Sequence, residues 1–144
     1  MANLAEEYRP IYKEILTTLQ KKYNYMTEVC RLTGEIEEAL KRDDRISTQM
    51  LLAMRQEELD GIKKCDKDLH LLIESTPEVL RQWLEKAVNG TIPQSDEYGT
   101  EENMVLRISA NIRSEWEKAV RIDRHVNRKL AGEESFYHDQ KDGE

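Results

Sequence analysis

The sequence is poor in the residues that interrupt helices and in those that cross-link a chain. Its 144 residues include only six glycines, three prolines, two cysteines and one phenylalanine. So little glycine and proline leaves few positions for tight turns, which argues against a fold of many short strands. The alternation of apolar and polar residues that is typical of strands is also missing. The sequence therefore predicts an all-α protein.

Long apolar runs and an excess of basic residues are missing as well. We identify no membrane span, and the first residues, with Glu6 and Glu7 among them, do not resemble a signal peptide. The net charge of −7 argues against nucleic acid as a partner, because such binding depends on neutralising phosphates. We expect a cytoplasmic protein that binds no nucleic acid.

Apolar residues recur at helical spacing in three long segments, of which residues 10–42 are the first. The seam of this segment returns every seven residues, as in a helix packed along another helix. Gly34 lowers the helix propensity in the middle of this segment. The seam consists of Tyr12, Leu19, Met26, Thr33 and Leu40.

A break at residues 42–45 separates this helix from a second one over residues 46–74. One of the aspartates of the break, or Ser47, can cap the new helix. Arg55 and Asp66 interrupt the second apolar stripe, which leaves its register open. Two long helices joined by so short a connection predict an antiparallel hairpin.

A short third helix and a long fourth one complete the prediction. The third begins after Ser75 or Thr76 as cap, with Pro77 in its first turn, and ends at residues 89–90. The fourth covers residues 101–131 and follows a loop at residues 91–99.

Thr100 is expected to cap the fourth helix, and Gly132 is expected to end it. We predict an elongated helical bundle built on the long antiparallel hairpin, with residues 1–132 as a single helical domain. Residues 133–144 are expected to form an acidic, flexible tail.

No catalytic, cofactor-binding or metal-binding residues are predicted. His70, His125 and His138 lack metal-ligand spacing, and no phosphate-binding loop or dinucleotide fingerprint occurs. Cys30 and Cys65 are expected to be free thiols. The predicted hairpin places them roughly 10 Å apart along the helices, whereas a disulfide needs Cα atoms within about 7 Å.

One pattern resembles the magnesium site of all-α nucleotide pyrophosphohydrolases of the MazG type. It consists of Glu35 and Glu38 on the first helix and Glu57 and Asp60 on the second. Four converging carboxylates of this kind could hold Mg²⁺ against a triphosphate. Glu38, however, lies about 200° around the helix from Ile36 on the seam. We therefore predict exposed carboxylates and no enzyme, and we keep this hydrolase as the alternative.

The fourth helix is the predicted partner-binding surface. Its stripe is long and regular, and Trp116 is the expected anchor, because aromatic residues dominate such interfaces. The competing interpretation makes this stripe the third wall of the core. Arg121, Arg124 and Arg128 share one face and could steer an acidic partner. The candidate partner-binding residues are Ile108, Ile112, Trp116, Val120, Phe136 and Tyr137.

Residues 31–72 read RLTGEIEEALKRDDRISTQMLLAMRQEELDGIKKCDKDLHLL. A long helix ending in an Ala-Leu-x-x-x-Asp turn and a second helix carrying Arg-Gln-Glu-Glu-Leu resemble the FlgN family of flagellar type III export chaperones. The resemblance implies a cytosolic chaperone for hook–filament junction proteins, which binds the helical terminal segments of this protein cargo. A further alternative is a coiled-coil scaffold that forms homodimers.

Overall fold

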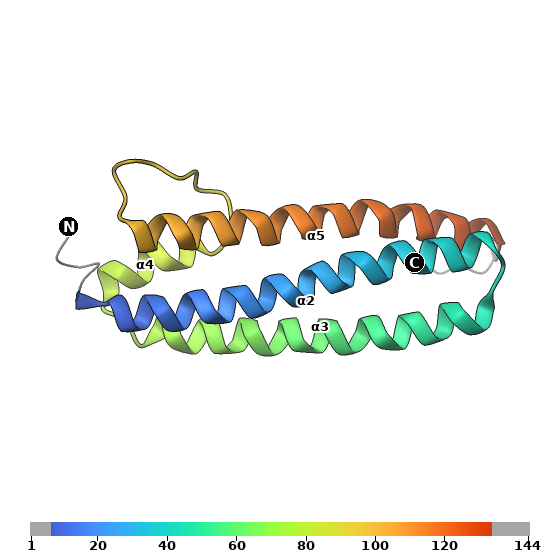
Figure 1. The fold of residues 1–144 in the computed structure, drawn as a ribbon, viewed down its shortest axis with the longest axis horizontal. Coiled ribbons are helices and arrows are strands. Elements are labelled where there is room, and N and C mark those ends of the chain that lie inside the picture. The colour runs from blue at the N-terminus through green and yellow to red at the C-terminus, as the bar shows by residue number, and fades with distance from the viewer. Residues whose placement is uncertain (1–6, 134–144) are drawn as a thin grey trace, which may run out of the picture.

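The computed structural model describes residues 7–133, with side chains up to residue 128. Four helices follow one another: α2 (Arg9–Lys41), α3 (Arg45–Glu74), α4 (Glu78–Ala87) and α5 (Thr100–Glu133). Figure 1 shows an elongated bundle in which α2 and α3 form an antiparallel hairpin and α5 runs along α2. Within residues 7–133 there is no strand. The predicted all-α bundle on a long hairpin is confirmed.

The turn of the hairpin lies at the predicted position. Asp43 has a φ of 56°, in the left-handed region that aspartate tolerates better than most residues. The amides of Asp43 and Asp44 donate to the carbonyls of Leu40 and Ala39, which ends α2. Asp44 then caps α3, because its Oδ1 accepts a hydrogen bond from the Ser47 amide at 3.0 Å.

Two helix ends differ from the prediction. The N-cap of α4 is Pro77, and the hydroxyls of Ser75 and Thr76 instead donate to the carbonyls of Leu72 and Ile73, at the end of α3. Gly132, expected to follow the fourth helix, lies within α5. Ser75 and Thr76 therefore bond the end of α3 and not the start of α4, and α5 continues through Gly132.

The core follows α2, which packs against both α3 and α5. Ile15, Leu19 and Leu32 of α2 are almost fully enclosed. At the amino-terminal end of α2, the short helix α4 adds Leu84, which is fully buried in the same cluster as Leu106 of α5. A smaller cluster of Ile36, Leu40 and Val126 closes the end nearest the hairpin turn.

The connection from α4 to α5 is held at both of its ends. Gly90 has a φ of +75°, and a Cβ there would lie 2.5 Å from the carbonyl oxygen of Ser109, so only glycine fits. Further along, the Asn103 side chain bonds both the amide and the carbonyl of Ser95. The ring of Tyr98 packs against that of Trp83 at 5.8 Å. This connection therefore fixes α4 against the start of α5.

None of the helices within residues 7–133 has the length and apolar character that crossing a membrane would require.

Candidate helix-binding groove

The bundle is open along one side, between α3 and α5. Both helices pack on α2, but their own backbones hardly approach each other, and α4 fills the space between them only at one end (Figure 1). An amphipathic helix carries its apolar residues in a stripe along one side. Because α3 and α5 do not meet, part of the apolar surface of α2 and of its two neighbours stays uncovered. The result is a groove beyond the end of α4.

Two adjoining hollows make up this groove, with volumes of about 550 and 120 Å³. Leu59 of α3 and Trp116 of α5 line both of them, so the hollows are consecutive parts of one surface. The larger is lined by Lys22, Met26, Gln56, Leu59, Ile62, Lys63, Asp66, Val88, Asn89, Ser109, Ile112, Arg113 and Trp116. The smaller is lined by Val29, Thr33, Arg55, Leu59, Trp116, Ala119, Val120 and Asp123.

Trp116 is the most exposed large hydrophobic side chain of the groove. Its exposed fraction is 48%, whereas Ile112, one turn away on the same helix, is 7% exposed. The difference arises because Ile112 points at α2 and Trp116 lies over the gap toward α3. A half-exposed tryptophan beside buried aliphatic residues is typical of a binding surface.

Part of the predicted partner-binding set is buried in the structure. Ile112 belongs to the core, together with Val105, Ala119 and Val126 of the same stripe. Over most of its length this stripe is the third wall of the core, as in the competing interpretation.

The other candidate residues occupy different positions. Trp116 and Val120 line the groove, as does the buried Ile112, and Ile108 is half-buried against the core cluster. Phe136 and Tyr137 lie outside the described residues. Of the candidate residues that the structure describes, Ile112, Trp116 and Val120 line the groove.

Sequence reasoning missed the contribution of α3. Leu59, Gln56 and Lys63 form the wall opposite Trp116. A signal was present, because Arg55 and Asp66 interrupt the apolar stripe of α3, and both line the groove. A charged residue within a stripe can mark the border between the covered and uncovered parts of a helix face.

Two ion pairs bridge the helices around the groove. Lys22 of α2 contacts Asp66 of α3 at 2.6 Å, and Arg55 of α3 contacts Asp123 of α5 at 2.9 Å. The second pair crosses the gap between α3 and α5 and closes the end of the groove away from α4.

The side chains that line the groove carry a net positive charge, although the chain as a whole is acidic. Four basic residues and two acidic residues line it, whereas the whole chain carries a net charge of −7. Lys63 is exposed on the α3 wall, and Arg113 lies on the α5 wall, where it also pairs with Glu117 at 3.2 Å. Ser109 adds a buried hydroxyl with no hydrogen-bond partner within the described residues. The surroundings therefore favour an apolar ligand with acidic edges.

Another hollow lies on the opposite side of α3, between α2 and α3, with a volume of about 460 Å³. It is open to solvent, and Leu71 and Leu72 are its only apolar lining residues. It offers a ligand less apolar area than the larger hollow of the α3–α5 groove does. We therefore place the candidate site at the α3–α5 groove.

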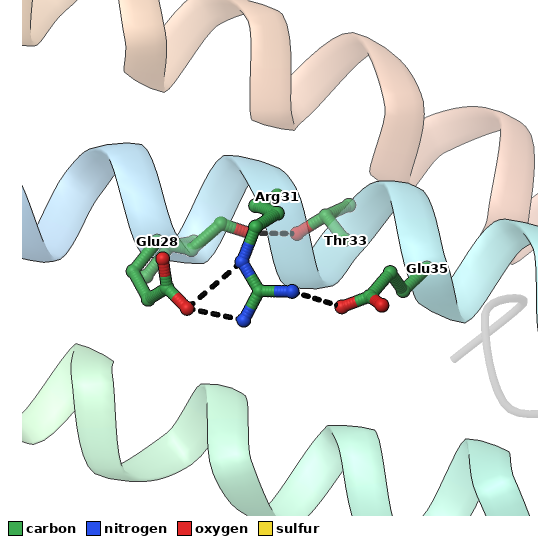
Figure 2. Close-up of polar contacts among 5 residues, drawn as sticks. Glu28, Arg31, Thr33 and Glu35 are labelled. Atoms are coloured by element: carbon green, nitrogen blue, oxygen red, sulfur yellow. Dashed lines mark hydrogen bonds and ion pairs between the residues drawn. The ribbon is translucent and has the colours of Figure 1, made fainter.

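The four carboxylates of the hydrolase pattern do not converge. Figure 2 shows Glu35 paired with Arg31, which also binds Glu28, on the exposed surface of α2. Glu38 pairs with Lys41 at 3.4 Å, and Asp60 accepts a hydrogen bond from Gln56. Among the described residues, no group of three or more histidine, cysteine, aspartate or glutamate side chains is arranged to hold a metal ion.

Both cysteines are free, as predicted. Cys65 is buried and Cys30 is half-buried, and burial raises the pKa of both thiols above its ordinary value. Glu115 raises the pKa of Cys30 further. A raised pKa suppresses the thiolate, so these side chains act as packing groups and not as nucleophiles at neutral pH.

Comparison of the chain with protein-family models, with curated protein sequences and with solved structures gives no match.

Proposed function

We propose that this protein binds an amphipathic helix of a partner protein in the α3–α5 groove. The observation that carries the proposal is the position of Trp116, half-exposed over an apolar floor between two helices that do not close on each other. Helix-in-groove binding uses such a surface, in which the ligand helix replaces the missing wall of a bundle.

The size of the groove defines the ligand. It extends along α5 from Ser109 to Asp123. These residues are roughly 21 Å apart at 1.5 Å per residue, so a helix of about 14 residues fits. Its apolar face would contact Trp116 and Leu59 with residues spaced three and four apart. Its flanking positions would carry aspartate or glutamate, opposite Lys63 and Arg113.

The resemblance of residues 31–72 to the FlgN family supports a specific version of this function. In that version the protein is a cytosolic export chaperone, and the ligand is the helical terminal segment of a flagellar hook–filament junction protein. The long hairpin and the open groove on its side are compatible with holding an aggregation-prone helix before export. A groove shared by three helices would also release its ligand without unfolding the core.

Calorimetric titration with two peptides tests both the binding of a helix in the groove and the export-chaperone assignment. One peptide is the terminal helix of a hook–filament junction protein from the same organism. The other is a designed 14-residue helix with an apolar face and acidic edges. We expect both to bind, and we expect Trp116→Ala to raise Kd about 30-fold, equivalent to ~2 kcal/mol.

Val79→Ala is the matched control, since Val79 of α4 is exposed and lies outside the groove. This variant should bind like the wild type, and both variants should keep the wild-type melting temperature. Binding of the designed helix alone would leave the groove function standing and overturn the export-chaperone assignment. No binding of either peptide, or equal binding by the Trp116→Ala variant, would overturn the groove function itself.

A further inference from the structure

The gap between α3 and α5 continues past the groove, toward the hairpin turn (Figure 1). On α3, Leu52 is 40% exposed and lies one turn before the groove residue Gln56, on the same side of the helix. On α5, Arg124 and Arg128 follow the groove residue Val120 at intervals of four residues. Both walls of the groove therefore continue beyond the ion pair that closes it. This continuation, between Leu52 and the two arginines, is the turn-side extension of the groove.

Basic side chains border the turn-side extension on both helices. Arg45 lies seven residues, or about two turns, before Leu52, so the two share one face of α3. Arg45, Arg124 and Arg128 are all exposed. The adjoining groove is itself lined by more basic than acidic residues. An occupant of the whole gap should therefore be acidic, with an apolar group to cover Leu52.

The chain supplies a segment of this chemistry directly after α5. Residues 134–144 have a net charge of −3, because four of them are acidic and one is a lysine. These charged residues are Glu134, Asp139, Lys141, Asp142 and Glu144. Phe136 and Tyr137 form an aromatic pair near the start of the segment. Aromatic groups followed by carboxylates complement an exposed leucine that is bordered by arginines.

The arrangement of the helices brings the end of α5 close to the turn-side extension. Arg55 bonds Asp123, so these two residues are level along the bundle. Because α3 runs antiparallel to α5 (Figure 1), Leu52, three residues before Arg55, is level with Val126. The last residue of α5 is Glu133, seven residues and roughly 10 Å past Val126. The segment that follows Glu133 therefore starts roughly 10 Å from the level of Leu52.

The segment is long enough to cover the gap. An extended chain advances about 3.4 Å per residue, so Tyr137 can reach roughly 14 Å back from Glu133, which includes Leu52. Trp116 lies 17 residues before Glu133, at roughly 26 Å along α5. Asp142 can reach roughly 31 Å, past Trp116. The segment can therefore extend over both the turn-side extension and the groove.

We propose that residues 134–144 fold back over the turn-side extension and the groove, where they compete with the partner helix. This inference rests on the proposed function and adds its regulation. Phe136 and Tyr137 cover Leu52, and the carboxylates that follow them lie along the basic border of the groove. A partner helix then binds only the fraction of molecules whose groove is free, which raises its apparent Kd.

The segment of the same chain is favoured over that of a second copy. It is joined directly to α5, so its effective concentration at the groove is about millimolar, far above that of a second copy in dilute solution. A partner helix can still displace it. The segment offers Phe136 and Tyr137 as its aromatic groups, whereas an amphipathic helix lays a continuous apolar face over Leu59 and Trp116.

Disulfide trapping in the full-length chain tests the contact. The background is Cys30→Ser with Cys65→Ala, so that no native thiol competes. Gln49→Cys is combined with His138→Cys, which leaves the aromatic pair in place. Gln49 is exposed on α3, one turn before Leu52. We expect copper phenanthroline to oxidise the two new thiols to an intramolecular disulfide, which mass spectrometry detects.

Lys67→Cys, again combined with His138→Cys, is the matched control. Lys67 is exposed and lies 18 residues after Gln49, so it is on the same face of α3 but roughly 27 Å further from the turn. Residue 138 cannot reach it, and we expect little disulfide. Equal trapping at residues 49 and 67 would overturn the contact. A covalent dimer in place of the intramolecular disulfide would make a second copy the occupant and overturn the proposal.

Calorimetric titration with the designed acidic helix tests the competition. The full-length variant with Phe136→Ala and Tyr137→Ala should bind this helix about fivefold more tightly than the wild type, because a larger fraction of its grooves is free. Gln140→Ala is the control, since it changes an uncharged residue of the same segment, and it should bind like the wild type. Circular dichroism confirms that each variant is folded.

The titration separates this proposal from the groove function. An unchanged Kd for the double variant would overturn the competition. A higher Kd would also overturn it, and would place Phe136 and Tyr137 in contact with the partner helix. In both cases the wild type still binds the designed helix, so the groove function stands. Failure of both the wild type and the double variant to bind would overturn the groove function itself, and this regulation with it.

Discussion

Arg55 connects all three long helices of the bundle. From α3, its Nη1 donates to Asp123 of α5 at 2.9 Å and to the Thr33 hydroxyl of α2 at 3.3 Å. The two long helices that flank the groove hardly touch elsewhere, so this ion pair sets their separation at one end. Its side chains are part-buried, with exposed fractions of 18% for Arg55 and 38% for Asp123.

A double-mutant cycle measures this connection. We expect Arg55→Met and Asp123→Asn to show a coupling in the free energy of unfolding of about 0.5–1 kcal/mol, since the pair is partly exposed to solvent. The coupling should shrink at high salt. Additive effects of the two substitutions at low salt would contradict an energetic role for the pair. Urea titrations of the four proteins provide the values.

The two glycines inside the long helices should respond oppositely to alanine. At Gly34 of α2 a Cβ meets nothing within 4 Å, so Gly34→Ala should stabilise the protein by about 0.5–1 kcal/mol through helix propensity. At Gly61 of α3 a Cβ would lie 2.6 Å from the ring of Tyr25, which packs against the core. Gly61→Ala should therefore be destabilising. Thermal melts compare the two, and a stabilising Gly61→Ala would contradict the close α2–α3 contact.

Sequence periodicity predicts the helical hairpin, but it does not predict which side chains of α5 stay exposed. The seam of α2 and the break at residues 42–45 predict the hairpin, because a local pattern determines each helix and a short connection leaves only one way to pack them. The exposure of Trp116 is different, since one amphipathic stripe contains both Trp116 and the buried Ile112. Whether α5 packs on one helix of the hairpin or on both is decided by long-range contacts, and the sequence of α5 alone does not contain that information.

Tyr12 should make stability fall at alkaline pH. Burial raises the pKa of its phenol well above the ordinary value of about 10, and Glu102 and Glu101 add to this effect. The unfolded chain ionises this group first, so its contribution is complete below pH ~10 and is lost as pH rises further. Tyr12→Phe should therefore reduce the loss of unfolding free energy between pH 9 and 11. Denaturant titrations across this range, with pH 7 as reference, test the effect, and equal slopes for both proteins would contradict it.

The cap of α3 should weaken in acid. Hydrogen bonds from the side chain and amide of Ser47 lower the pKa of Asp44, helped by Arg42. The stabilisation is thus present above the unfolded pKa of about 4 and is lost as pH falls through the folded value. We expect Asp44→Ala to lower Tm by about 2–4 °C at pH 7, with a smaller difference at pH 2–3.

Asp44→Asn is the control for the cap, because asparagine caps helices about as well as aspartate but does not titrate. Its Tm at pH 7 should stay near that of the wild type. If the alanine and asparagine variants melt alike at pH 7, the hydrogen bonds to Ser47 do not stabilise the start of α3.

The fluorescence of Trp116 tests most directly whether a partner helix covers the groove. The chain has two tryptophans, so Trp83→Phe leaves Trp116 as the only one, and circular dichroism confirms that the variant is folded. Titration with the designed acidic amphipathic helix, which carries no tryptophan, should shift the emission to shorter wavelength as the half-exposed indole leaves water. The shift should saturate at the stoichiometry found by calorimetry. Calorimetric binding without any change in the emission of Trp116 would place the ligand elsewhere and contradict the groove as the binding site.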